Sequence, residues 1–322
     1  MSKLSIEDFQ EIRCWMYRNA RPLDLARWQY HFEKGSAEQV LQALEAYRNR
    51  DKGFGHALDA DNWNPNSSPY TTGIAVAILH EIGIADAHHP QITGILAYLE
   101  HCEPFSEQGW LFTIPSNSDF PHAPWYTYSE QNNIDNGFHA TAGLAGFILK
   151  FADPSSGLYT RALALGDKMM DKLRKSGQLE SHELGGYATF LRDVESAALN
   201  GRYNCDELAV RLQELVNDAI ERDPAKWPVY SMRPSMYISS AASIFYKGNE
   251  EIMEKELDYI LHSRTGEGVW DIMWNWADYP NAFAVAENWW KANWAIHNVL
   301  LLREFGRIEV YVNPILTFTS SS

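Results

Sequence analysis

The 322-residue sequence has little cysteine, few basic residues and no long apolar run. Its three cysteines, Cys14, Cys102 and Cys205, are scattered and odd in number, which argues against a disulfide framework and favours a reducing compartment. Acidic residues outnumber basic residues by 42 to 27, and the formal charge is −15. Because nucleic acids and anionic membrane surfaces select for clusters of Lys and Arg, neither is an expected partner.

The sequence also lacks membrane and cofactor motifs. No window of 18 apolar residues occurs, and Glu7, Asp8 and Glu11 interrupt the region where a signal peptide would be apolar. There is no HExxH, CxxC, EF-hand or GxxxxGK[ST] pattern, and the motif at 53–55 lacks the third glycine of a dinucleotide site. We therefore expect a cytoplasmic protein with no integral membrane segment, no metal and no cofactor.

Aromatic residues are plentiful, and many of the tryptophans lie in expected loops. The chain has 12 Trp, 16 Tyr and 14 Phe, together 13% of its residues. The most distinctive loop is 51–72, DKGFGHALDADNWNPNSSPYTT, which combines two glycines, several aromatic side chains and two aspartates two positions apart. A loop that merely connects two helices needs none of these features, so we expect this loop to have a function.

Hydrophobic periodicity predicts an all-α protein in which amphipathic helices alternate with apolar, small-residue helices. We expect helices at 5–19, 22–34, 36–49, 69–83, 89–101, 137–151, 158–175, 182–199, 205–221, 235–246, 249–262 and 282–302. They form about six hairpins that repeat every 40 to 60 residues. The favoured arrangement is one α/α-toroid domain, 1–322, with loops 51–68, 103–136, 223–234 and 264–280 on one rim of a central cavity. The loop that starts after Cys102 is expected to be long and irregular.

Several segments place a glycine and an aromatic residue shortly before an apolar helix: 52–55 before 71–79, Gly109-Trp110 before 138–149, and 268–270 before 289–301. In these segments the chain resembles the α/α-toroid superfamily of terpenoid cyclases and protein prenyltransferases. It looks most like a bacterial group of uncharacterised prenyltransferase-like proteins, over nearly its whole length. The resemblance implies a small apolar, isoprenoid-type substrate held in the central cavity.

The chain departs from both enzyme classes of that superfamily. The Asp, Cys and His zinc ligands of protein prenyltransferases have no counterpart here. The Asp-x-Asp-Asp motif of class II terpenoid cyclases is matched in part by Asp59-Ala60-Asp61, but Asn62 replaces its last aspartate. Few basic residues lie in the expected rim loops, which favours a proton-initiated reaction over ionisation of a diphosphate.

Protonation of an alkene requires a carboxylic acid that burial or a neighbouring carboxylate keeps protonated. Asp61 is the candidate acid, with Asp59 beside it and His56 or His122 as its hydrogen-bond partner. The ordinary alternative is that both aspartates cap turns, as Asp commonly does.

The candidate substrate-binding residues are aromatic or polar side chains of the expected rim and inner helices. Aromatic faces stabilise cations, and they also stack on sugar rings. The candidates are Trp63, Trp125, Tyr126, His139, Trp270, Trp274, Trp276, Glu287 and Trp290. Glu287 has an ordinary explanation in a helical ion pair with Lys291, four residues on.

Two other functions remain open from the sequence. A carbohydrate-active toroid, either a hydrolase or a lyase, would need two carboxylates across a cleft, and Asp61 with Asp271, Asp278 or Glu287 would supply them. The third hypothesis is a ligand-binding protein without catalytic activity.

Overall fold

The computed structural model describes residues 2–102 and 105–309, so residue 1, positions 103 and 104 of the expected long loop, and the last residues of the expected domain lie outside it. The prediction of an all-α protein is confirmed, because helices dominate both ranges and the sheet found there has two strands. The α-helices are α1 (Ile6–Asn19), α2 (Pro22–Phe32), α3 (Ala37–Leu44), α4 (Pro69–Glu81), α5 (Pro90–His101), α6 (Glu130–Asp135), α7 (His139–Phe151), α8 (Gly157–Lys175), α9 (Ser181–Ser196), α10 (Asn200–Tyr203), α11 (Cys205–Ala219), α12 (Glu250–His262) and α13 (Pro280–Glu304).

Shorter elements lie in the connections. The 3-10 helices are η1 (Glu45–Tyr47), η2 (Pro115–Asp119), η3 (Pro124–Tyr126), η4 (Pro224–Lys226) and η5 (Pro234–Met236). Strands β1 (Phe105–Ser106) and β2 (Gly109–Trp110) pair in antiparallel register, with Phe105 opposite Trp110.

The starts of the helices follow from local sequence. Ser36 and Gln39 form a capping box at the start of α3, as their spacing predicts. The Ser68 hydroxyl accepts a hydrogen bond from the Thr71 amide at the start of α4, and Pro69 occupies the first helical position, where its missing N–H costs nothing. The second of these caps determines where the loop between α3 and α4 ends.

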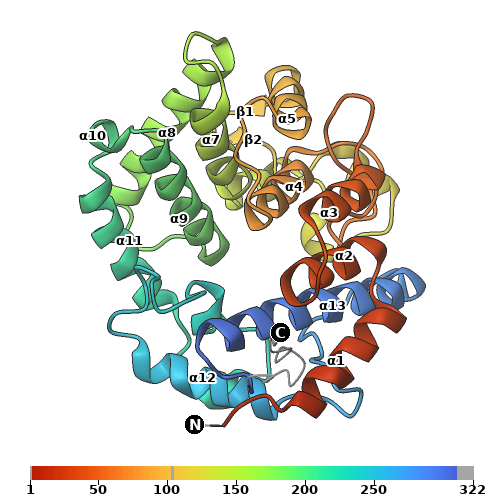
Figure 1. The fold of residues 1–322 in the computed structure, drawn as a ribbon. Coiled ribbons are helices and arrows are strands. Elements are labelled where there is room, and N and C mark those ends of the chain that lie inside the picture. Colours follow the sequence, from red (N-terminus) through yellow and green to blue (C-terminus); the bar gives the residue numbers. More distant parts are fainter. Residues whose placement is uncertain (1, 103–104, 310–322) are drawn as a thin grey trace, which may run out of the picture.

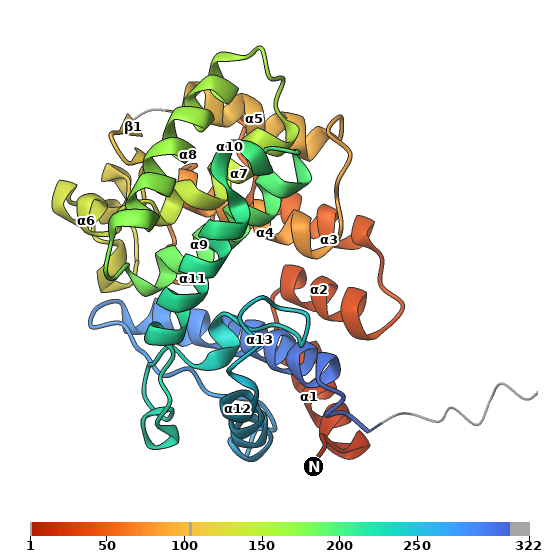
Figure 2. The ribbon, with the colours of Figure 1, turned by 90° about the vertical axis from the view of Figure 1, so that its left-hand side faces the viewer.

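The helices follow one another around the molecule in chain order. In Figure 1 the chain runs from α1–α3 through α4, α5 and α7 to α8–α11, and then through α12 to α13, which lies beside α1 and α2. Helix α7 packs against α4, α8 and α9, while α13 packs against α1 and α2. Figure 2 shows α13 passing between α2 and the α12 end of the molecule.

Backbone hydrogen bonds join the two ends of the described chain. The Leu4 amide donates to the Arg307 carbonyl over 2.8 Å, and the Glu309 amide donates to the Leu4 carbonyl over 3.0 Å. The last helix is therefore held to the first segment.

Two predictions about secondary structure are wrong. The segment 235–246 forms turns after η5 and no α-helix. Its serines explain the difference, because Ser240 and Ser243 accept hydrogen bonds from the amides of Ala242 and Phe245, which compete with helical bonding. The region 105–136 is also more ordered than expected, since it contains the two strands, η2, η3 and α6.

Candidate functional site

A tight turn between α3 and α4 presents both candidate aspartates. His56 and Ala57 adopt left-handed backbone angles, with φ of 54° and 59°. The turn lies against residues 121–123, where the Trp63 amide donates to the Pro121 carbonyl over 2.9 Å and the Ala123 amide donates to the Asp61 carbonyl over 2.8 Å. Non-glycine residues at positive φ are uncommon and concentrate at functional sites, so this turn is a candidate site by its backbone as well as its side chains.

Asp61 is 3% exposed and is held by two tryptophans from the far end of the chain. The Trp276 indole N–H donates to Oδ1 over 2.8 Å, and the Trp274 indole N–H donates to Oδ2 over 3.1 Å. Trp290 lies close to the same carboxylate, but its buried indole N–H forms no hydrogen bond among the described residues.

Asp59 is 4% exposed and has different partners. Its Oδ1 accepts a hydrogen bond from the Asp61 amide over 2.8 Å, and its Oδ2 accepts a short one from the Tyr126 hydroxyl. The first contact is the turn-capping bond that the ordinary explanation predicts. The second ties the turn to η3.

The expected hydrogen-bond partners of the acid are wrong. His56 contacts Oδ1 of Asn49, and the ring nitrogens of His122 contact the Phe120 carbonyl and the Thr127 hydroxyl. The left-handed backbone at His56 and the short β-bridge between Asn62 and His122 direct both rings elsewhere. Indoles and a phenol take the positions proposed for histidine.

The pair retains a proton near neutral pH. Burial and the neighbouring charge of Asp59 raise the pKa of Asp61 to about 7, against the opposing effect of the indole hydrogen bonds. Burial also raises the pKa of Asp59, although the hydrogen bond from Tyr126 acts in the other direction. A carboxyl group that is protonated close to the working pH is suited to general acid catalysis.

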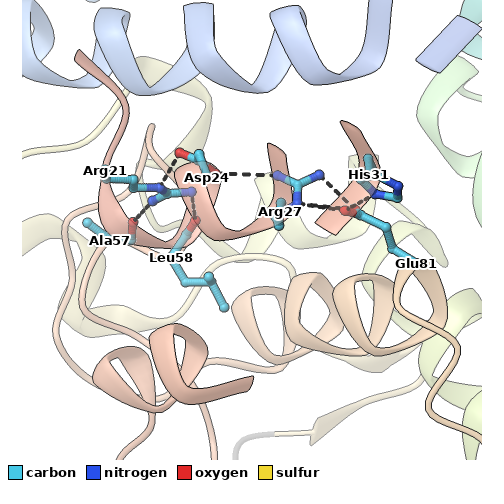
Figure 3. A network of polar contacts seen from close by, with 7 residues as sticks. All are labelled: Arg21, Asp24, Arg27, His31, Ala57, Leu58 and Glu81. Carbon is cyan, nitrogen blue, oxygen red and sulfur yellow. Dashed lines mark hydrogen bonds and ion pairs between the residues drawn. The ribbon is translucent and has the colours of Figure 1, made fainter. Parts of the chain in front are cut away.

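A row of charged side chains along α2 and its N-cap residue, Arg21, holds the turn in place (Figure 3). The Arg21 guanidinium donates to the carbonyls of Ala57 and Leu58 over 2.7 and 3.0 Å and to Asp24 over 2.7 Å. Further along α2, Arg27 binds Glu81 at the end of α4 over 2.7 Å, and His31 contacts the same carboxylate over 2.8 Å. The row thus links α2 to the aspartate turn at one end and to α4 at the other.

One cavity lies against the turn, and a second cavity adjoins the first. The smaller, about 230 Å³, is lined by Asp59, Arg21, Arg27, Glu81 and side chains of α4 and α13 that include Trp289 and Trp290. The larger, about 490 Å³, lies between α4, α7 and α9. Tyr70, Ile74, Ala77 and Glu81 line both, so the cavities are neighbours, and their combined size suits a small molecule.

Glycine and small residues leave the larger cavity open. Gly73, Gly143 and Gly185, one from each of the three helices, line it, and a β-carbon at Gly185 would meet no atom within 4 Å. Polar side chains lie among them, including His139, His182 and Thr189, with His80, Glu81 and Arg192 on the same wall.

Aromatic rings connect these features. Tyr70 packs edge-on against Phe112 and His139, with ring centroids 4.7 and 5.2 Å apart. Trp63 stacks on Trp289 at 5.5 Å and meets Trp276 edge-on at 6.5 Å. The expected substrate-binding residues Trp63, Tyr126, His139, Trp274, Trp276 and Trp290 are therefore brought together around the aspartates and the cavities.

Three other candidates lie elsewhere. The Trp270 indole N–H donates to the Ile260 carbonyl over 2.8 Å, so this side chain anchors the end of α12. Trp125 is 40% exposed in η3. Glu287 lies 3.3 Å from Lys291, the helical ion pair that its spacing predicts, and Lys291 also binds Asp271 over 2.9 Å. The carboxylates proposed as partners of Asp61 for sugar cleavage therefore include two, Asp271 and Glu287, that are ion-paired with Lys291.

Sequence reasoning missed four polar residues near the cavities: Tyr70, Glu180, His182 and Tyr230. Tyr70 belongs to a helix that reads as apolar, which gives no sign of a polar role. His182 follows Glu180 by two positions in a helix start, a spacing that suits capping and gives no sign of its third contact, with Tyr230.

Within residues 2–102 and 105–309, no group of three or more His, Cys, Asp or Glu side chains is arranged to hold a metal ion. In the same ranges, no helix has both the length and the apolarity needed to cross a membrane. Comparison of the chain with family models, curated proteins and solved structures finds no significant match. The resemblance to terpenoid cyclases and prenyltransferases therefore stays a prediction.

Proposed function

We propose that this protein is an enzyme that binds a small, largely apolar ligand in the two cavities and protonates it with the Asp59–Asp61 pair. One observation carries the proposal: a buried carboxylate pair, with a pKa of about 7 at Asp61, has one member in the wall of an aromatic-lined cavity. A proton-initiated, terpenoid-cyclase-like reaction is the chemistry that this arrangement favours.

The acid group has what such a reaction needs. The pair holds one proton between its two carboxyl groups, and Asp59, which lines the cavity, gives that proton to the ligand. Both carboxyl groups are then ionised. The indole N–H groups of Trp274 and Trp276 stabilise the conjugate base at Asp61. The rings of Trp289, Trp290 and Tyr70 in the cavity wall stabilise positive charge on the protonated ligand.

We propose an α/α toroid as the architecture behind this cavity. The chain-order circuit of helices and the hydrogen bonds between Leu4, Arg307 and Glu309 support it. The turns at 235–246 replace one of the expected inner helices.

A deuterium-incorporation experiment tests the acid. The wild type is incubated with neutral isoprenoid alkenes in D₂O, and products are analysed by mass spectrometry. We expect one carbon-bound deuterium per product molecule from the wild type and a loss of at least 100-fold in rate with Asp59→Asn or Asp61→Asn. Turnover by both variants at the wild-type rate would contradict the proposal.

Binding is measured in parallel by thermal shift. A ligand at ~100 times its dissociation constant adds about 2.7 kcal/mol of stability. The panel contains isoprenoid alkenes, polyprenyl diphosphates and oligosaccharides. Stabilisation by isoprenoids without any deuterated product would indicate a binding protein with no catalytic activity.

One observation favours a carbohydrate-active enzyme as the second candidate. Asp59 and Glu81 both line the smaller cavity. Burial opposes ionisation of Glu81, but Arg27 and His31 outweigh it and lower its pKa to about 2. A protonated and an ionised carboxyl group on one cavity is the combination that glycosidases use. Stabilisation by oligosaccharides alone, with hydrolysis lost in Glu81→Gln, would establish this second function and exclude the first.

A further inference from the structure

A second set of hydrogen-bonded titratable groups lies at the start of α9, outside the aspartate turn. Glu180 is the N-cap residue, and its Oε2 accepts hydrogen bonds from the amides of His182 and Glu183 over 2.8 and 3.0 Å. Its Oε1 lies 2.8 Å from Nδ1 of His182. The opposite ring nitrogen, Nε2, lies 2.6 Å from the hydroxyl of Tyr230.

The charge on Glu180 determines where the protons lie. Burial opposes ionisation, but the hydrogen bond with His182 and the charge of that ring outweigh it and lower the pKa of Glu180 to about 2. An ionised carboxylate only accepts hydrogen bonds, so Nδ1 of His182 carries the hydrogen. Burial and the charge of Glu180 raise the pKa of Tyr230, so its hydroxyl keeps its proton and donates to Nε2 of the neutral ring. Carboxylate, imidazole and hydroxyl thus stand in the order found in catalytic triads.

One member of this set, His182, reaches the proposed ligand site. His182 lines the larger cavity and stacks on His139, with ring centroids 5.5 Å apart. The Nδ1 atom of His139 is buried without a hydrogen-bond partner in the described ranges. On the other side, the Tyr230 ring meets Trp274 edge-on at 5.9 Å, and Trp274 donates to Asp61. One ring therefore separates Tyr230 from the acid.

We propose that Tyr230, activated by His182 and Glu180, is the proton acceptor for a ligand that extends from the larger cavity past the His182 ring to this hydroxyl. When the ligand loses a proton, the electron pair of the broken C–H bond remains in the ligand as a new double bond. The proton passes to the Tyr230 oxygen, whose own proton moves to Nε2 of His182. Glu180 is a positioning residue that holds the ring and stabilises the imidazolium.

The catalytic role of Tyr230 rests on the proposed function, and it specifies the class of reaction further. The Asp59–Asp61 pair adds one proton to the ligand and Tyr230 removes another, so the product is an isomer of the substrate. Neither water nor a redox partner is consumed. Solvent then removes the proton from His182 and restores the proton of the aspartate pair, and the 46% exposure of Tyr230 gives solvent access to this end.

Reaction with an aryl sulfonyl fluoride tests the activation of Tyr230 without any ligand. The Tyr230 oxygen forms a bond to sulfur, the S–F bond breaks, fluoride leaves, and the phenolic proton goes to His182. Tyr17 and Tyr279, 44% and 41% exposed, are internal controls in the same chain. Because Tyr17 donates to a carboxylate oxygen of Glu33, it also controls for an acidic neighbour.

We expect labelling of Tyr230 at least 10-fold faster than that of Tyr17 or Tyr279 at pH 8, quantified by peptide mass spectrometry. Glu180→Gln should lower this rate several-fold, because the His182 ring then loses the carboxylate that holds it and stabilises its charge. Tyr237→Phe is the matched control, since the Tyr237 hydroxyl binds the Ser181 carbonyl beside the same helix start and has no part in the relay.

Equal labelling of Tyr230 and Tyr279 in the wild type would overturn the proposal, and this comparison requires no variant to fold. A fast Tyr230 whose rate is the same in Glu180→Gln would also overturn the relay. Failure of the deuterium experiment with fast, Glu180-dependent labelling would instead reject isoprenoid protonation and leave the activated tyrosine in place.

Discussion

The indole nitrogen of Trp276 lies 2.8 Å from Oδ1 of Asp61, although 215 positions separate the two residues in the chain. This contact joins the segment before α13 to the turn before α4. The donor at this position is a neutral indole. A cationic partner there would instead keep Asp61 ionised. The candidate acid is therefore both buried and hydrogen-bonded, and several measurable properties depend on that.

The pH dependence of stability should report Asp61. Its pKa rises from 3.8 to about 7 in the folded protein, so the native state holds a proton that the unfolded state releases. This contribution is fully present below pH 3.8 and is lost as pH rises through 7. At ~1.4 kcal/mol per pH unit, the free energy of unfolding of the wild type should fall by roughly 2–4 kcal/mol between about pH 4 and 7. Asp61→Asn should abolish this fall. Urea unfolding of both proteins at each pH measures it, and parallel curves would contradict the prediction.

Replacing Trp276 with Phe should move that pH window. The substitution removes an indole donor and leaves a carboxylate oxygen less satisfied, at a cost of about 1–3 kcal/mol. The hydrogen bond from Trp276 lowers the pKa of Asp61. Its loss should therefore raise that pKa and extend the pH-dependent fall in stability to higher pH. Trp270→Phe is the control, since it loses a bond to the Ile260 carbonyl and should destabilise without shifting the window. Identical shifts in both variants would exclude a specific effect on Asp61.

Arg21→Lys should loosen the aspartate turn. One guanidinium contacts two carbonyls and Asp24, and a single ammonium does not reproduce that fork. We expect a loss of about 2–4 kcal/mol and faster amide hydrogen exchange at 56–62. Arg13→Lys, at a more exposed ion pair with Glu33, should cost no more than ~1 kcal/mol and leave that exchange unchanged.

Two adjacent glycines of α9 should respond in opposite ways to alanine. A β-carbon added at Gly185 would meet no atom within 4 Å, so Gly185→Ala should stabilise the helix by about 0.5–1 kcal/mol. At Gly186 the added carbon would lie 2.9 Å from Cβ of Ala142 on α7. Gly186→Ala should therefore push the helices apart and cost about 1–3 kcal/mol. Thermal unfolding distinguishes the two, and equal effects would indicate that α7 and α9 pack differently.

Local features of the sequence predicted most of the helices and the position of the candidate acid. Ser36 with Gln39 and Ser68 with Pro69 define helix starts through contacts within a few residues. The spacing of Asp59 and Asp61 likewise produces a local hydrogen bond between them. Periodicity misled at 235–246, because apolar spacing there coexists with serines that bond to nearby amides.

The sequence by itself thus determined the helical class, the aspartate turn and the supply of aromatic side chains, because these depend on neighbours along the chain. The tertiary structure alone decided which groups meet. It gave Asp61 two indoles instead of a histidine, set Trp270 apart from the site, and joined His182 to Tyr230 across 48 positions. Such partners depend on how helices pack over long sequence separations, and no local spacing encodes that packing.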